Sequence, residues 1–191
     1  MIKNYHLGLG LTRRGMQIWL SDNMGNISVE LAPSETDEVR GLISELDQTL
    51  AANYRPEERH GVPLDALFQP HIRFFLARLD GTAVGCGGVA FFPGFAEVKR
   101  MYVRDIARRR GVAQAMLNRI EAEVHEAGVA MLRLETGTHQ EAAIQLYVRA
   151  GFQRCAAFGE YADMAPTAIG TSVFFEKRLA CIDHKSLEIC D

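Results

Sequence analysis

The sequence predicts a mixed α+β domain built on a mostly antiparallel sheet, and two patterns support this prediction. First, strand-like runs at residues 72–79, 84–92 and 95–103 are separated only by Asp80-Gly81 and Pro93-Gly94. Such dipeptides favour tight turns, so the three runs should form an antiparallel meander. Second, a strand–helix–strand order spans residues 95–135, and a crossover of this kind places its two strands parallel.

Hydrophobic spacing predicts the elements before the meander. Residues 27–32 alternate apolar and polar side chains, as a half-buried strand does. Ser34 with Asp37 resembles a capping box that opens a helix. Apolar residues then recur at helical spacing from Val39 to Leu50. A loop and a short second helix are expected within residues 54–69.

After the meander, the spacing of the apolar residues changes to that of a helix. This helix should begin at Gly111 and end at Gly128, which suits a left-handed C-cap. Residues 129–135 are predicted as a strand, and residues 140–150 as a helix closed by Gly151. Further strands are expected from Phe152 and at residues 172–177. The predicted order is βααβββαβαββ.

Length and composition indicate a single domain with a small net charge. The 191 residues carry a formal net charge of −3, which gives no global attraction to nucleic acid or an anionic membrane. No run approaches the ~20 apolar residues of a membrane span, and no secretory signal is evident. We therefore expect a cytoplasmic protein with a domain at residues 27–178, an N-terminal tail or extension at 1–26 and a C-terminal tail at 179–191.

Cysteine and histidine spacing predicts neither disulfides nor a metal site. The four cysteines show no CxxC pair, and the six histidines form no HxxxH or HExxH pair. This usage is typical of a reducing compartment.

The segment with the clearest chemical signal is residues 97–113. A predicted strand runs into Arg108, Arg109 and Arg110, after which Gly111-Val112-Ala113 opens a helix. The first N–H groups of a helix are unpaired and carry partial positive charge. Together with arginines and small residues, they form a binding site for a pyrophosphate. No GxxxxGK[ST] loop is present, and the glycine-rich run at residues 85–88 lies within a strand.

This segment resembles the acyl-CoA-binding motif [QR]-x-x-G-x-[GA] of the GNAT N-acetyltransferase superfamily, read here as Arg108-x-x-Gly111-x-Ala113. A second resemblance follows in the right order: LETG at residues 134–137, then Ala143-x-x-Leu146-Tyr147-x-x-x-Gly151-Phe152. The resemblance covers residues 27–178. It is greatest to small stand-alone bacterial members, through Phe158-Gly159-x-Tyr161 and Ser172-x-Phe174.

The resemblance implies a twisted sheet with one splayed parallel pair and helices on both faces. It also implies acetyl-CoA as co-substrate, with no metal. The backbone of Met101, Tyr102 and Val103 would pair with the pantetheine arm, and the backbone of Arg108, Arg109, Arg110, Gly111, Val112 and Ala113 would hold the pyrophosphate. Gln140 stands where the family often has a cofactor-binding asparagine.

The resemblance also implies the proton chemistry. Tyr147 would protonate the departing thiolate, and Glu97 would act as general base. Glu135 on the neighbouring strand and a bound water are rivals for the base role, and His139 suits a helix cap as well as a base. The residues implied on the acceptor side are Tyr54, Arg55, Arg59, His60 and Arg73.

The function that these residues predict is direct acetyl transfer to a primary amine, most simply that of a small molecule. Cys86 and Cys155 have no histidine partner in sequence, which disfavours an acetyl-enzyme. The alternative is a module that binds acyl-CoA without catalysis. Nucleic-acid binding by the arginine run is disfavoured because no aromatic residues interleave with it. Dimers are common in the family, so a homodimer is an open expectation.

Overall fold

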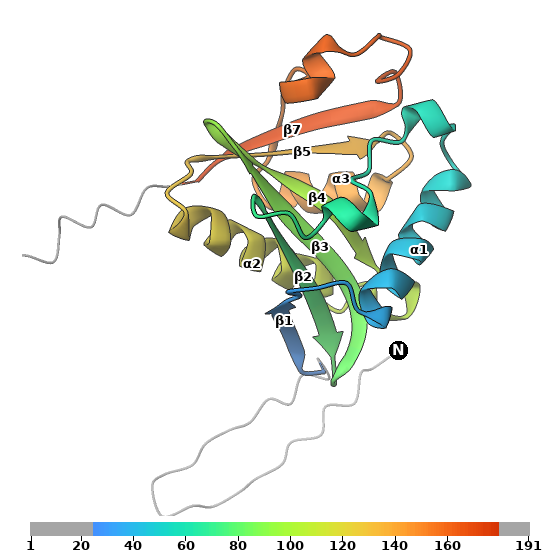
Figure 1. The fold of residues 1–191 in the computed structure, drawn as a ribbon, viewed down its shortest axis with the longest axis vertical. Helices are drawn as coiled ribbons and strands as arrows, with labels where there is room; N and C mark the ends of the chain where they lie inside the picture. Colours follow the sequence, from blue (N-terminus) through green and yellow to red (C-terminus); the bar gives the residue numbers. More distant parts are fainter. Residues whose placement is uncertain (1–24, 180–191) are drawn as a thin grey trace, which may run out of the picture.

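The computed structural model describes residues 25–179, and within them seven strands form one sheet in the order β1-β2-β3-β4-β5-β7-β6 (Figure 1). The strands are β1 (Ile27–Leu31), β2 (Ile72–Leu79), β3 (Thr82–Phe92), β4 (Phe95–Val103), β5 (Met131–Gly137), β6 (Gln153–Arg154) and β7 (Ser172–Arg178). Neighbouring strands are antiparallel except β4 and β5, which are parallel. The α+β class predicted from the sequence is confirmed.

Three α-helices and four 3₁₀ turns accompany the sheet in the described part of the chain. The helices are α1 (Asp37–Ala51), α2 (Val112–Glu126) and α3 (Glu141–Arg149). The 3₁₀ turns are η1 (Pro56–Glu58), η2 (Leu64–Ala66), η3 (Asp105–Ala107) and η4 (Gly159–Asp163).

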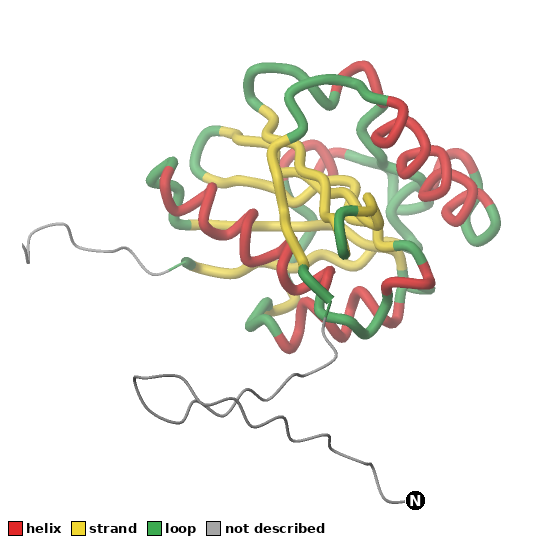
Figure 2. Tube along the Cα trace, turned by 90° about the horizontal axis from the view of Figure 1, so that it is seen from below, coloured by secondary structure: helices red, strands yellow, loops and turns green. Residues whose placement is uncertain are grey.

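Helices lie on both faces of the sheet, as Figures 1 and 2 show. The alternation along β2 defines the two faces. Phe75 and Ala77 pack in the cluster that contains the buried faces of α2 and α3. Phe74 and Leu76 pack in the cluster under α1 and η2. Each large apolar side chain buried in this way contributes about 1.5–3 kcal/mol, so both helical layers are held to the sheet.

Most predicted boundaries lie within two residues of the observed ones, and three local predictions were wrong. Thr36, not Ser34, is the N-cap of α1, because its side chain accepts a hydrogen bond from the Val39 N–H. The short second helix is only the 3₁₀ turn η2, beginning after Pro63. The strand expected from Phe152 is reduced to the two residues of β6.

The tails expected at residues 1–26 and 179–191 lie outside the described residues except at 25, 26 and 179, so they stay predictions. Among the described helices, none has the length and apolar character needed to span a bilayer. Within residues 25–179, no group of three or more His, Cys, Asp or Glu side chains is placed to hold a metal ion.

Candidate active site

The candidate site lies where β4 and β5 diverge. The two strands pair over only three positions, from Ala96 opposite Leu132 to Val98 opposite Leu134. Beyond them β4 continues alongside β3, and β5 continues alongside β7. Within the described residues, the facing edges of β4 after Val98 and of β5 after Leu134 are therefore unpaired. A cavity of about 120 Å³ opens between them and extends to α1, α3 and η4.

A β-bulge in β4 helps to produce this divergence. Gly88 lies opposite Lys99 and Cys86 lies opposite Tyr102, so the two residues between Lys99 and Tyr102 face a single residue of β3. One of them, Arg100, has a left-handed φ of 57°. A bulge of this kind bends its strand and redirects its side chains. It places the side chains of Lys99 and Arg100 on the cavity together.

Glu97 belongs to a buried polar trio at the cavity wall. Its Oε1 accepts a hydrogen bond from the Tyr161 hydroxyl at 2.9 Å and pairs with the Lys99 ammonium at 2.7 Å. Lys99 also donates to the Tyr161 hydroxyl oxygen at 3.1 Å. Only 3% of Glu97 is exposed. Within the described residues its second oxygen, Oε2, accepts no hydrogen bond, which leaves it available to a group in the cavity.

Burial sets the acidity of Glu97. Desolvation raises the pKa of its carboxyl above the ordinary value, while Lys99 and then Tyr161 oppose this by lowering it. The net direction is upward. A carboxylate with a raised pKa accepts a proton more readily than an exposed one.

Glu135 presents a second carboxylate from β5. Ser172 on β7 donates a hydrogen bond to Glu135 Oε1 at 2.6 Å. Burial raises the pKa of Glu135, and the Ser172 hydroxyl partly offsets that rise. Glu97 and Glu135 both line the cavity, so the structure brings together the two carboxylates that the sequence left as alternatives.

Tyr147 enters the cavity from α3. Its ring packs edge-on against Phe152 and at a tilt against Phe175, which fixes the side chain in the core. Its hydroxyl lies 3.8 Å from the Met101 sulfur, within the range of a weak hydrogen bond. Burial raises the pKa of Tyr147 well above its ordinary value, so the hydroxyl stays protonated at neutral pH.

The predicted pyrophosphate-binding loop, residues 108–113, comes after β4 in the sequence. It is separated along the chain from both Glu97 and Glu135. Gly111 is the N-cap of α2 with φ 85°, and no acidic residue occupies the first turn of that helix. Arg108 and Arg109 are exposed, and Arg109 also has a positive φ. Residues 108–113 do not line the cavity. This loop therefore lies outside the cavity, with Arg108, Arg109 and Gly111 on the protein surface.

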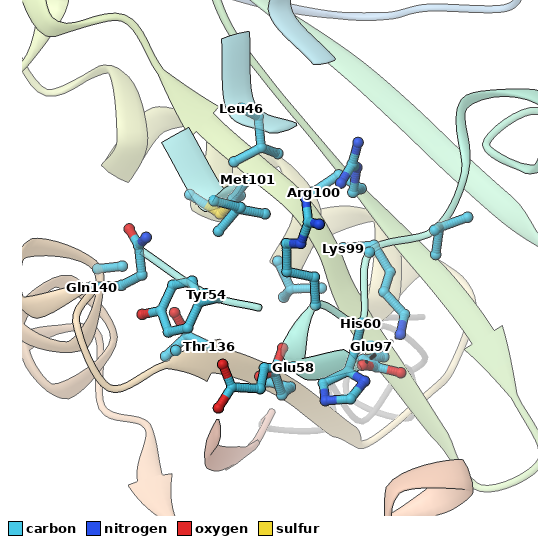
Figure 3. Close-up of a pocket in the computed structure, with 18 of the residues that line it drawn as sticks. Leu46, Tyr54, Glu58, His60, Glu97, Lys99, Arg100, Met101, Thr136 and Gln140 are labelled. Carbon is cyan, nitrogen blue, oxygen red and sulfur yellow. Dashed lines mark ion pairs between the residues drawn. The ribbon is translucent and has the colours of Figure 1, made fainter. Parts of the chain in front are cut away.

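Residues that the sequence placed on the acceptor side have different outcomes. Tyr54 and His60 line the cavity (Figure 3), and so does Arg59. Arg55 is exposed and does not line it. Arg73 also lies elsewhere, paired with Glu123 of α2 at 3.7 Å.

Two polar residues at the start of α3 have different positions relative to the cavity. The N-cap is Gln140, and its side chain lines the cavity. His139 does not line it, and its N–H donates to the Tyr54 hydroxyl at 2.8 Å. The Tyr54 hydroxyl in turn occupies the space beside Gly137, where an added Cβ would collide with it.

The sequence predicted no role for Lys99. Tyr161 stood out only as part of the resemblance to small bacterial members of the family. Lys99 carried a usable signal, because it stands two residues after Glu97 on a strand and therefore shares its face. Tyr161 carried none, since its contact with Glu97 joins positions 64 residues apart.

Comparison with known proteins identifies the family. A family model described as the acetyltransferase (GNAT) family matches residues 41–152. The chain belongs to the GNAT family of acetyltransferases. It is 40% identical over 158 residues to an IAA acetyltransferase of Azospirillum brasilense, which covers 82% of this chain and 100% of that protein. It is 32% identical over 145 residues to the uncharacterized N-acetyltransferase YsnE of Bacillus subtilis, covering 74% and 93% of the two chains.

Solved GNAT structures share the fold. A structure from Klebsiella pneumoniae described as an acyl-CoA N-acyltransferase is 31% identical, with a TM-score of 0.64 over 81% of this chain and 98% of that one. The PaiA N-acetyltransferase of Thermoplasma acidophilum, solved in complex with coenzyme A, is 18% identical with a TM-score of 0.60, covering 80% and 99%.

Proposed function

We propose that this GNAT acetyltransferase transfers the acetyl group of acetyl-CoA directly to a primary amine of a small molecule. The observation that carries the proposal is the cavity at the β4–β5 divergence, where Glu97, Glu135 and Tyr147 meet from three elements. Its volume of about 120 Å³ is about that of four water molecules, at roughly 30 Å³ each in the liquid. A space of this size favours a small acceptor group.

The described residues fit acetyl-CoA, which supplies an activated acetyl thioester when bound. The unpaired edge of β4 offers backbone groups of Met101 and Val103 to a pantetheine arm, with Tyr102 between them directed to Glu45 of α1. At Gly111 an added Cβ would approach only an Ile27 methyl at 3.7 Å, so the backbone there is open. We assign pyrophosphate binding to the backbone of residues 108–113 and the exposed arginines, and a further contact to Gln140.

The proposed proton path uses groups that line the cavity from different elements. An alkylammonium must lose a proton before it can attack a thioester. We assign that proton to Glu97, directly or through one water, because its Oε2 has no partner in the described residues and burial raises its pKa. Glu135 is the competing base. We assign protonation of the leaving thiolate to Tyr147, whose raised pKa keeps its proton available.

Direct transfer is favoured over an acetyl-enzyme by the state of Cys86. This residue is fully buried in β3, and burial raises the pKa of its thiol to about 12. A thiol of that pKa is almost entirely protonated at neutral pH and is a poor nucleophile. It also does not line the cavity.

The test is initial-rate kinetics of CoA release with a panel of primary amines, with mass spectrometry of the products. IAA is assayed separately, beside the amine panel, because the Azospirillum relative is named for it. We expect an N-acetylated product and intersecting double-reciprocal lines, since both substrates must be bound together. Parallel lines would indicate an acetyl-enzyme. Tight acetyl-CoA binding without transfer to any panel member would instead favour the non-catalytic module.

A further inference from the structure

Two arginines that line the cavity each have a donor without an acceptor. Arg100 comes from the bulge of β4, and Arg59 comes from the segment between α1 and β2. Within residues 25–179, only four buried side-chain nitrogen or oxygen atoms lack a hydrogen-bond partner. Two of the four are the Nε atoms of these arginines. Burying a donor without an acceptor is costly. The presence of two such donors at one cavity therefore points to a ligand that binds there.

Arg100 is held rigidly in this position. Its side chain is only 6% exposed, and one of its terminal nitrogens pairs with Asp47 of α1 at 2.7 Å. The backbone of Gly61 lies directly against the guanidinium, where an added Cβ would collide. Asp47 is half-exposed, so water screens its charge and the pair neutralises Arg100 only in part.

Arg59 has even fewer partners. Among the described residues, no ion pair or side-chain hydrogen bond involves its guanidinium, although its Nε is buried. The residue as a whole is half-buried, and burying one donor of a charged group without an acceptor is unfavourable. A guanidinium presents parallel N–H donors that match the two oxygens of a carboxylate.

The cavity also carries acidic groups, and these limit what the arginines can bind. Glu58, Glu97 and Glu135 line it, and in the view of Figure 3 Glu58 and Glu97 lie on the side opposite Arg100 and Met101. Glu97 is already paired with Lys99. This arrangement suits a ligand with a cation at one end and a single negative charge at the other. A phosphate dianion would meet three carboxylates in the same small space.

We infer that the acetyl acceptor is a small amine that carries a carboxylate, as an amino acid does, and that Arg59 and Arg100 bind the carboxylate. This inference rests on the proposed function, since it names the substrate class of that site. The ammonium end is directed towards Glu97 and Glu135, which places the nitrogen beside the proposed base. The arginines thereby act as specificity residues.

The test is calorimetric binding to the CoA-loaded full chain, using matched sets of an amino acid, its primary amide and its decarboxylated amine. We expect the amino acids to bind about 10- to 100-fold more tightly than their amides, the usual loss when a charge-assisted hydrogen bond is removed. Arg59→Gln should weaken the amino acids by a similar factor and leave the amides unchanged. Arg59→Lys should restore part of the affinity.

Arg55→Gln is the matched control, because Arg55 lies on the same segment, is exposed and does not line the cavity. An equal loss in this variant would overturn the inference, as would amides that bind as tightly as the acids. Failure of every carboxylate-bearing amine to bind would also overturn it. Acetyl-CoA binding and CoA release with other amines, measured on the same protein, report separately on the proposed function.

Discussion

Replacing Tyr161 with phenylalanine should identify which carboxylate is the general base. The Tyr161 hydroxyl donates to Glu97 Oε1 at 2.9 Å and has no role in the Glu135–Ser172 contact. That hydrogen bond stabilises the ionised carboxylate, so its loss raises the pKa of Glu97 above its already raised value. If Glu97 is the base, the acidic limb of the kcat/KM profile moves to higher pH.

The size of the movement follows from the contacts that remain. A hydrogen bond to a charged group contributes about 1.5–3 kcal/mol, and about 1.36 kcal/mol corresponds to one pKa unit. Lys99 stays paired with the same oxygen at 2.7 Å, so the lower end of that range applies. We expect an upward shift of about one pH unit, with little change in the plateau at high pH.

The companion variant is Ser172→Ala, which removes the donor to Glu135 Oε1. If Glu135 is the base, this variant moves the acidic limb upward and Tyr161→Phe does not. Ser44→Ala, on the exposed side of α1, serves as the control for loss of a serine hydroxyl. Thermal melting should show that all three variants fold. An acidic limb that is unmoved in Tyr161→Phe would refute the assignment of Glu97.

Three further predictions concern the acid, the cofactor site and the core. Tyr147→Phe should lower kcat by about 10²–10⁴-fold with the KM for acetyl-CoA little changed; unchanged turnover in steady-state assays would reject its role. Gly111→Glu should weaken acetyl-CoA binding at least about tenfold by calorimetry, because it adds negative charge and strain at the N-terminus of α2. Gly128→Glu, also at a positive φ but beyond the other end of α2, should bind normally. Leu117→Ala should cost about 2–5 kcal/mol in urea unfolding, since Leu117 is fully buried, and a smaller loss would show that the core around α2 can collapse.

The fold was predictable wherever local patterns determine it. Gly128 adopts the left-handed conformation expected of it after α2, and Gly151, expected to close the next helix, also has a positive φ. The turns of the meander fall at the predicted dipeptides. Thr36 and Ser34 both suit a helix cap, and only the direction of the entering chain decides between them. The bulge at Arg100 depends on how β4 is aligned with β3. The pattern of residues within β4 alone does not predict that alignment.

The candidate site was predictable only in part, and for a related reason. Motif spacing brought out Tyr147 and Glu97, and both line the cavity. The resemblance also placed Arg59 on the acceptor side, and it lines the cavity. Long-range contacts determine the rest: Tyr161 reaches Glu97 from η4, and the bulge of β4 brings Arg100 to the cavity. The sheet brings these residues together, so they become visible only when the strands are placed. Arg73 is the opposite case. The sequence placed it on the acceptor side, but its side chain pairs with Glu123 of α2.

The most direct test of the central claim is a crystal structure of the protein with acetyl-CoA. We predict the pantetheine arm between the unpaired edges of β4 and β5, hydrogen-bonded to the backbone of Met101 and Val103. The pyrophosphate should lie on the backbone of residues 108–113, and the thioester sulfur within hydrogen-bonding reach of the Tyr147 hydroxyl. A cofactor bound outside the β4–β5 divergence, or a thioester distant from Tyr147, would contradict the account.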